Sequence, residues 1–302
     1  MGMSGVQAGT SLPASKVPSF AAMIDPHLSG PTGARGWCPP GSSGRIYGGA
    51  LLAQMVKAAA PLAHSDSRVN ALHSHFLRSG LAEHPVDYGM ELLQASRRFS
   101  TVRVDARQDG RLIATSTVSF HSPENSPAHS VHMAAEWSEP EGSEPAEDRR
   151  VPLLTAGIRA PWELRWAARL DSPGQAERPS VALWIRLRES AGEAASSHEA
   201  ALAWASDFTL TKVADIDYEH SSGPRQAASL DHAMWFHRPF RANDWLLHVQ
   251  DSPAYEQALA LTTGRVFDRS GNLIASVMQE SLLRRLPLGS GEDVTDLTPT
   301  GG

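Results

Sequence analysis

The sequence predicts an α+β protein built from two similar halves, each with an antiparallel sheet wrapped around one central helix. The first observation is an internal repeat: residues 111–116, after the turn Asp109-Gly110, resemble residues 272–277, after the turn Ser270-Gly271. About half of the 302-residue chain separates the two turns, which is too far for a solenoid or propeller and indicates two tandem domains. The second observation is that both halves place a helix and alternating strands in the same order.

A looser match upstream supports the duplication. Residues 73–78 in the first half correspond to residues 234–238 in the second, in the same order and at nearly the same offset as the repeated turns. Two such matches favour duplication over coincidence. Each repeated turn closes an alternating apolar segment, which is typical of an antiparallel hairpin.

The first domain is predicted at residues 19–121, after a loose tail of small and polar residues at 1–18. Residues 50–60 are apolar or small on all sides and end before Pro61, which predicts a buried helix. Four alternating strands should follow, at residues 69–77, 86–95, 99–108 and 112–121. A long buried helix followed by such a meander is the arrangement of a hotdog domain.

The second domain is predicted at residues 151–286, after a linker at 122–150 that is rich in Pro, Glu, Ser and Ala. Its central helix is expected at residues 198–213. Further strands are expected at Trp235 and at residues 162–170, 181–188, 245–251, 261–268 and 273–283. Residues 287–302 are polar and Gly-rich, so a disordered tail is expected there.

Composition excludes several classes of protein. The net charge of −6 argues against nucleic acid as a partner, because duplex binding needs clustered Lys and Arg. A hydrophobic share of 41% and a charged share of 20% are typical of a soluble globular protein, and no segment resembles a membrane span. Cys38 is the only cysteine, so an intramolecular disulfide is excluded. With neither a secretory signal nor a C-terminal Ser-Lys-Leu, we expect a cytoplasmic protein.

Three segments of the second half form a motif pattern: Ala-Ser-Asp-Phe at 205–208, Ala-Ser-Leu-Asp-His-Ala-Met-Trp-Phe-His-Arg-Pro-Phe at 228–240, and Ala-Ser-Val-Met-Gln-Glu-Ser at 275–281. In this order they resemble the acyl-CoA thioesterase II family, the double-hotdog thioesterases. The resemblance implies a double hotdog fold and hydrolysis of an acyl-CoA to a free carboxylic acid and CoA. CoA would be part of the substrate, and neither a separate cofactor nor a metal is implied.

The resemblance also assigns three catalytic residues, Asp207, Ser229 and Gln279. In the family these side chains hold and polarise a water that attacks the thioester directly, without a covalent acyl-enzyme. Ser229 stands where the family more often carries Thr, and either hydroxyl can both donate to and accept from water. The thioester carbonyl is expected near the N-terminal end of a central helix, where backbone donors favour developing negative charge.

The repeat provides a separate argument for Gln279. It aligns Gln279 with Val118, so a polar amide in one half corresponds to a core-type residue in the other. A polar side chain in an apolar strand costs free energy unless it is paired, which indicates a task for Gln279. The alternatives are that Gln279 lies on the solvent face and that Asp207 is a capping or helix-surface carboxylate.

Other candidates are less favoured. His73 and His75 share one face of a strand, but no third ligand is indicated for a metal. Asp231 and His232 are adjacent on a strand and point to opposite faces, which disfavours a catalytic dyad. Gly48-Gly49 before the first helix permits close packing, and could instead bring backbone N–H groups to a phosphate.

The chain departs from the family pattern at Ala50, Leu259, Ala260 and Ser281, where members usually carry Gln, Arg, Gly and Gly. These changes leave the acyl group and the thiol carrier open. A second hypothesis is therefore a non-hydrolytic acyl-thioester-binding or biosynthetic hotdog protein acting on acyl-CoA or an acyl carrier protein, and a third is hydration of an enoyl thioester. A double hotdog already contains a pseudo-dimer, so we expect any homo-oligomer to be a looser dimer of such units.

Overall fold

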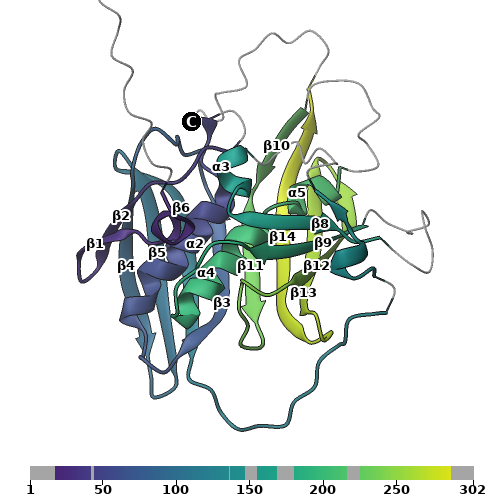
Figure 1. Cartoon of the computed structure of the whole chain (residues 1–302). Coiled ribbons are helices and arrows are strands. Elements are labelled where there is room, and N and C mark those ends of the chain that lie inside the picture. The colour runs from purple at the N-terminus through teal and green to yellow at the C-terminus, as the bar shows by residue number, and fades with distance from the viewer. Residues whose placement is uncertain are drawn as a thin grey trace, which may run out of the picture.

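The computed structural model describes residues 18–41, 44–135, 137–146, 155–168, 180–215 and 225–286. Residues 1–17 of the predicted N-terminal tail and all of the predicted C-terminal tail, 287–302, lie outside the described residues. Figure 1 shows the central helices in front of one broad curved sheet. The described strands form a 14-stranded antiparallel sheet.

The first half matches its prediction almost residue for residue. The predicted helix is α2 (Gly48–Ala59), and the four predicted strands are β3 (Arg68–Phe76), β4 (Val86–Ala95), β5 (Phe99–Gln108) and β6 (Arg111–His121). Three short elements precede them: α1 (Phe20–Ile24), β1 (His27–Gly30) and β2 (Gly33–Gly36). Alternation sets the register, since Val102, Val104 and Ala106 of β5 are fully buried while the residues between them face outward.

The second half repeats this order. Its sheet contains β8 (Trp162–Trp166), β9 (Ser180–Leu187), β10 (Arg225–Ser229), β11 (Asp231–Phe236), β12 (Leu246–Glu256), β13 (Leu259–Asp268) and β14 (Leu273–Arg285). Its helices are α3 (Ala156–Arg159), α4 (Ala195–Ser206) and α5 (Leu210–Val213).

The central helix of the second half differs from the prediction. A single helix was predicted over residues 198–213, but α4 begins three positions earlier and ends at Ser206. Asp207 is the C-cap, with φ −89° and ψ 5°, and α5 starts only after Thr209, whose φ is −136°. Asp is a weak helix former because its carboxylate competes for nearby backbone donors. Here it binds a backbone N–H of α2, so the break directs Asp207 out of the helix.

The two sheets join edge to edge through β3 and β11. In this antiparallel pair Ala233 lies opposite His73, and Trp235 lies opposite Ala71. The strand order is β1-β2-β4-β5-β6-β3-β11-β14-β13-β12-β9-β8-β7, where β7 is the short strand Glu144–Pro145, and β10 lies beside β14. The predicted double hotdog is therefore confirmed, and the join pairs two edges that would otherwise be exposed.

The interval between the halves adds to the second sheet. Its short strand β7 (Glu144–Pro145) pairs with β8. The carbonyl of Ser138 accepts the indole N–H of Trp184 at 2.8 Å. Because described residues of this interval pair with the second half, the exact limits of the two domains stay a prediction.

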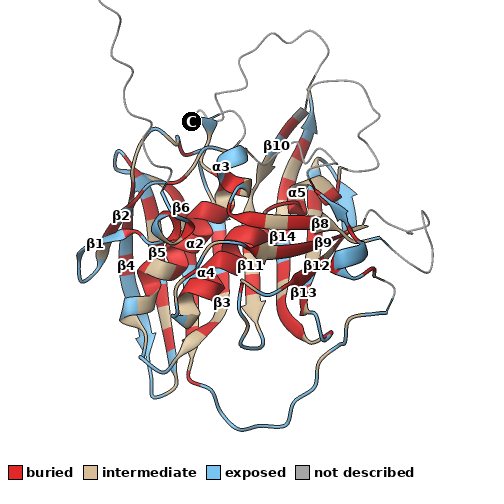
Figure 2. Cartoon of the chain, viewed as in Figure 1, coloured by how far each residue is buried: buried red, intermediate tan, exposed pale blue. Residues whose placement is uncertain are grey.

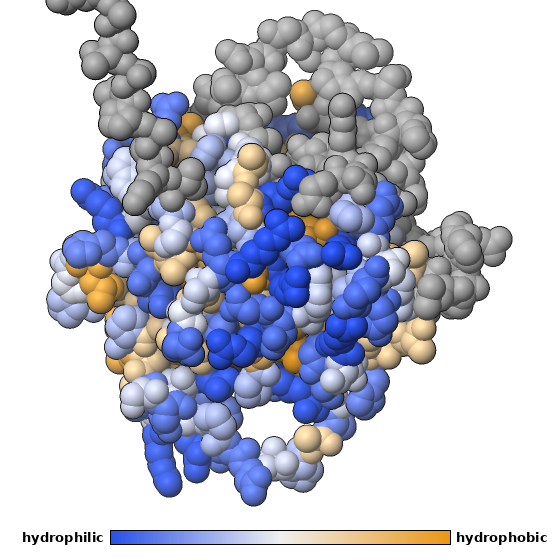
Figure 3. All heavy atoms as spheres, in the orientation of Figure 1, coloured by the Kyte–Doolittle hydropathy of each residue, from blue (hydrophilic) through white to orange (hydrophobic). Residues whose placement is uncertain are grey.

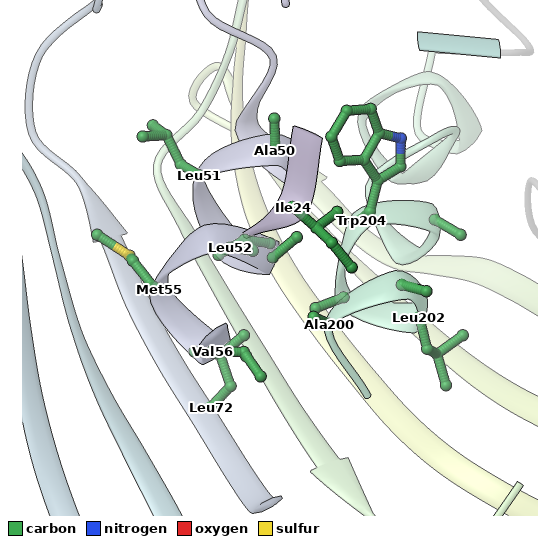
Figure 4. Packing of buried hydrophobic residues seen from close by; sticks show 14 of the residues in the cluster. Ile24, Ala50, Leu51, Leu52, Met55, Val56, Leu72, Ala200, Leu202 and Trp204 are labelled. Atoms are coloured by element: carbon green, nitrogen blue, oxygen red, sulfur yellow. The ribbon is translucent and has the colours of Figure 1, made fainter. Parts of the chain in front are cut away.

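The core lies between the sheet and the paired helices α2 and α4. In Figure 2 these two helices and the strands behind them form a continuous buried region. Figure 4 shows side chains of α2 and α4 interdigitating with Ile24 of α1 and Leu72 of β3. The ring of Phe20 packs edge-on against Trp162 and Trp204, with centroids 5.5 and 5.2 Å away. Helix α1 of the first half thus packs against the second half and holds the two together.

The outer surface is predominantly hydrophilic on the face seen in Figure 3, with small groups of apolar side chains among hydrophilic ones. Within the described ranges, no helix is both long enough and apolar enough to cross a membrane.

Candidate active site

Asp207 lies where the C-terminal end of α4 meets the N-terminal end of α2. Its Oδ2 accepts the backbone N–H of Gly49 at 2.9 Å. The residue before α2, Tyr47, donates its hydroxyl to the carbonyl of Trp204 at 2.8 Å. These two bonds fasten the start of α2 to the last turn of α4, and the positive end of the α2 dipole faces the carboxylate.

The Gly48-Gly49 pair makes this approach sterically possible. A Cβ at Gly49 would lie 2.4 Å from the carbonyl oxygen of Trp204, and one at Gly48 would lie 2.8 Å from Oδ2 of Asp207. The sequence interpretation that these glycines permit close packing is confirmed. The anion at the Gly49 N–H is the protein's own carboxylate rather than a phosphate.

The pKa of Asp207 is raised from 3.8 to about 7, mainly because burial disfavours the charged form. Hydrogen bonds from the Gly49 N–H and the Gln279 side chain oppose this rise by stabilising the carboxylate. The residue as a whole is half-buried. A carboxylate with a pKa near neutrality is suited to accept a proton from a weak acid such as water.

Gln279 lies on β14 and is fully buried, so the alternative that it faces solvent is wrong. Its Nε2 lies 3.0 Å from Thr211 Oγ1, 3.0 Å from Ser229 Oγ and 3.3 Å from Ser281 Oγ. Its Oε1 lies 2.7 Å from Nδ1 of His232. Every polar atom of the amide is therefore paired, as burial requires.

Ser229 ends β10 and is half-buried. It lies directly opposite Ser281 in the β10–β14 register, which brings its hydroxyl to the Gln279 amide. Its Oγ also lies 3.3 Å from Oγ1 of Thr211 on α5. The structure thus brings Ser229 and Gln279 together from two strands. Gln279 also lies near enough to Asp207, at the end of α4, to lower the pKa of its carboxyl.

Thr211, Ser281 and His232 also surround the Gln279 amide, although none of them was predicted as a site residue. The hydroxyls of Thr211 and Ser281 lie 3.0 Å apart beside the Gln279 amide. Ser281, one of the departures from the family pattern, is fully buried and adds a hydroxyl to the cluster. Thr211 lies on a short helix whose position only the fold determines.

His232 was considered and set aside because Asp231 is its neighbour in the chain. The two side chains do point apart: Asp231 Oδ1 accepts the backbone N–H of Glu280 at 2.7 Å, whereas His232 is fully buried. The same alternation places His232 on the inner face with Gln279. A usable signal was therefore present, since both are polar residues at inward positions of neighbouring strands.

The matching position in the first half has no polar group. Val118 is fully buried, and its cross-strand partners are Leu72 and Val102. The first half therefore has an apolar core at the position where the second half has the Gln279 cluster.

No arrangement of three or more His, Cys, Asp or Glu side chains in the part of the chain that the structure describes could hold a metal ion. His73 and His75 are exposed on the outer face of β3. The ring of His73 lies edge-on to Trp235 with centroids 5.0 Å apart.

Comparison with known proteins agrees with this fold. Residues 162–282 match the family model described as acyl-CoA thioesterase, and residues 34–121 match the acyl-CoA thioesterase N-terminal domain. The chain is 31% identical over 268 residues to acyl-coenzyme A thioesterase 8 of Mus musculus, covering 83% of each chain. It is 28% identical over 253 residues to acyl-CoA thioesterase 2 of Haemophilus influenzae, covering 80% of this chain and 88% of that one.

Among solved structures, an acyl-CoA thioesterase II, TesB2, from Mycobacterium marinum superposes with a TM-score of 0.77 at 32% identity, over 89% of this chain and 98% of that one. Fold and sequence together define a thioester hydrolase with two hotdog domains. The chain belongs to the acyl-CoA thioesterase II family. It is an acyl-CoA thioesterase, and the resemblance seen in its motifs is confirmed.

Proposed function

We propose that this protein hydrolyses acyl-CoA by direct attack of a water molecule held by Asp207, Ser229 and Gln279. The observation that carries the proposal is the meeting of a half-buried carboxylate of pKa about 7 with a fully buried amide and a hydroxyl. A base, a donor and a group that both donates and accepts are the elements needed to orient and deprotonate one water.

In this mechanism Asp207 accepts a proton from the water while the water oxygen bonds to the thioester carbonyl carbon. The C–S bond then breaks, and the leaving CoA thiolate takes up the proton from Asp207. The products are a carboxylic acid and CoA, with no covalent intermediate and no group beyond the substrate's own CoA. The carbonyl oxygen would lie near Gly48 at the start of α2, where the helix dipole favours negative charge.

The decisive test is thiol release from short, medium and long acyl-CoA, with the free acid measured in parallel. Equal amounts of thiol and acid, and no acyl adduct on Ser229 by mass spectrometry, are expected. Binding without thiol release across the panel by folded protein would support the non-hydrolytic alternative. Loss of enoyl absorbance without thiol release would support hydration.

The substrate class implied by the family is an acyl-CoA. Since β3 and β11 already join two hotdogs within one chain, further association should be a dimer of such units. Light scattering checks this, and a stable monomer would remove that part of the proposal. The cytoplasmic location stays a prediction, which fractionation of the source cells tests.

A further inference from the structure

His232 is a fully buried group that the proposed chemistry does not use. It lies between two functional segments: its Nδ1 is 2.7 Å from Gln279 Oε1, and its Nε2 is 2.9 Å from the hydroxyl of Ser206. Ser206 is the last residue of α4 and immediately precedes Asp207. The ring therefore connects the helix end that carries the base to the strand that carries the amide.

Two arrangements of hydrogens fit these distances. In the first, the Ser206 hydroxyl donates to Nε2, the Nδ1–H donates to Gln279 Oε1, and the amide NH₂ faces the reaction site. In the second, the Ser206 hydroxyl donates to the carbonyl of Ala203, 2.9 Å away, and the Nε2–H of His232 donates to the Ser206 oxygen. The Gln279 amide is then turned over, so that its NH₂ group donates to Nδ1 of His232. The amide then presents only an acceptor to the site.

The surroundings of the amide select the first arrangement. The nearest polar neighbours of Gln279 Nε2 are the hydroxyls of Thr211 and Ser229, each 3.0 Å away. The Gln279 side chain also lies close enough to Asp207 to lower the pKa of that carboxyl. An ionised carboxylate only accepts hydrogen bonds, so it favours NH₂ and repels a carbonyl oxygen at that place. Burial lowers the pKa of His232 to about 4, so the ring has one proton at neutral pH and cannot donate at both nitrogens.

We propose that His232 is a positioning residue, which holds the Gln279 carboxamide with its NH₂ group turned toward Ser229 and Asp207. It does so as the middle member of a chain of hydrogen bonds, in which the Ser206 hydroxyl donates to the ring and the ring donates to the amide oxygen. The orientation matters because an amide in the reverse orientation cannot donate to the water or to the developing oxyanion. The role in turnover rests on the proposed hydrolytic function, whereas the orientation itself does not.

A matched pair of variants tests the role in turnover. Asn places its amide nitrogen where Nδ1 lies in His, and Leu has as many side-chain heavy atoms as Asn but no donor. His232→Asn and His232→Leu therefore remove the same part of the ring and differ in the hydrogen bond to Gln279. We expect His232→Leu to lower kcat about 10- to 100-fold with KM little changed, because a buried acceptor loses its partner. His232→Asn should recover most of that loss. Equal kcat values in two variants with similar thermal unfolding would overturn the proposal.

The orientation is tested separately by ¹⁵N NMR of histidine side chains in the unmodified protein, with His232→Asn used to assign the signal. We expect the Nδ1–H tautomer at pH 8, whereas an Nε2–H tautomer would overturn the proposal whatever the activity. If the protein released no thiol from any acyl-CoA, the proposed function would fail, and the tautomer alone would decide the inference about His232.

Discussion

Replacing Asp207 with Asn should remove most of the activity and at the same time stabilise the fold at neutral and alkaline pH. Asn keeps an oxygen that can accept the Gly49 N–H, which now binds Oδ2 at 2.9 Å, but it cannot accept a proton from water. General-base contributions are about 10²–10⁴-fold in rate, so kcat should fall within that range while substrate binding changes little.

The stabilising effect follows from the pKa of Asp207, which is 3.8 ordinarily and about 7 in the folded protein. Between these two values the folded state binds a proton that the unfolded state does not, so the free energy of unfolding falls as pH rises through this window. Three pKa units correspond to about 4 kcal/mol. Residual solvent exposure reduces this value, and we expect Asp207→Asn to gain about 1–3 kcal/mol above pH 7.

Urea unfolding of the two proteins at pH 8 and at pH 4 measures this effect, with thiol release measured on the same preparations. The stability advantage of Asp207→Asn should be full at pH 8 and should shrink toward pH 4, where the wild-type carboxyl is protonated in the folded state. Glu83→Gln, which also removes one carboxylate, is a control because Glu83 is exposed. Full activity in Asp207→Asn, or a stability loss that does not vary with pH, would refute the assignment of Asp207 as a half-buried base.

Three further predictions concern neighbouring groups. The kcat/KM of the wild type should rise with pH through a midpoint near 7, the pKa of Asp207. Gln279→Leu should move this midpoint upward, because the amide stabilises the carboxylate. An unchanged midpoint in a stopped-flow pH series would contradict the influence of Gln279 on Asp207. Ser229→Thr should keep activity and Ser229→Ala should lower kcat, and equal rates for the two variants would exclude a role for the hydroxyl. Gly49→Ala should destabilise the protein by about 1–3 kcal/mol, because its Cβ would lie 2.4 Å from a backbone oxygen. Thermal unfolding measures this loss, with Gly89→Ala as the control because the Cβ would have open space there.

Much of the fold could be predicted from the chain because its signals are local. Helix α2 and strands β3 to β6 depend on periodicity within about ten residues and on turns such as Asp109-Gly110, whose positive φ values match a tight hairpin. The duplication was visible because the same hairpin occurs twice. Motifs identified Asp207, Ser229 and Gln279 without stating how they meet.

The tertiary structure determined what depends on pairing between distant segments. The Asp207 carboxylate binds a backbone N–H 158 positions away, and His232 binds an amide 47 positions away. No local sequence pattern predicts either contact. Asp207 leaves α4 and binds a donor on another helix, and His232 reaches the Gln279 amide because β11 pairs with β14. The sequence by itself determines the elements and the types of side chain proposed for catalysis. The raised pKa of Asp207 and the bonded surroundings of Gln279 arise only when the two helices and the joined sheet enclose them, because burial and hydrogen-bond partners are properties of the packed molecule.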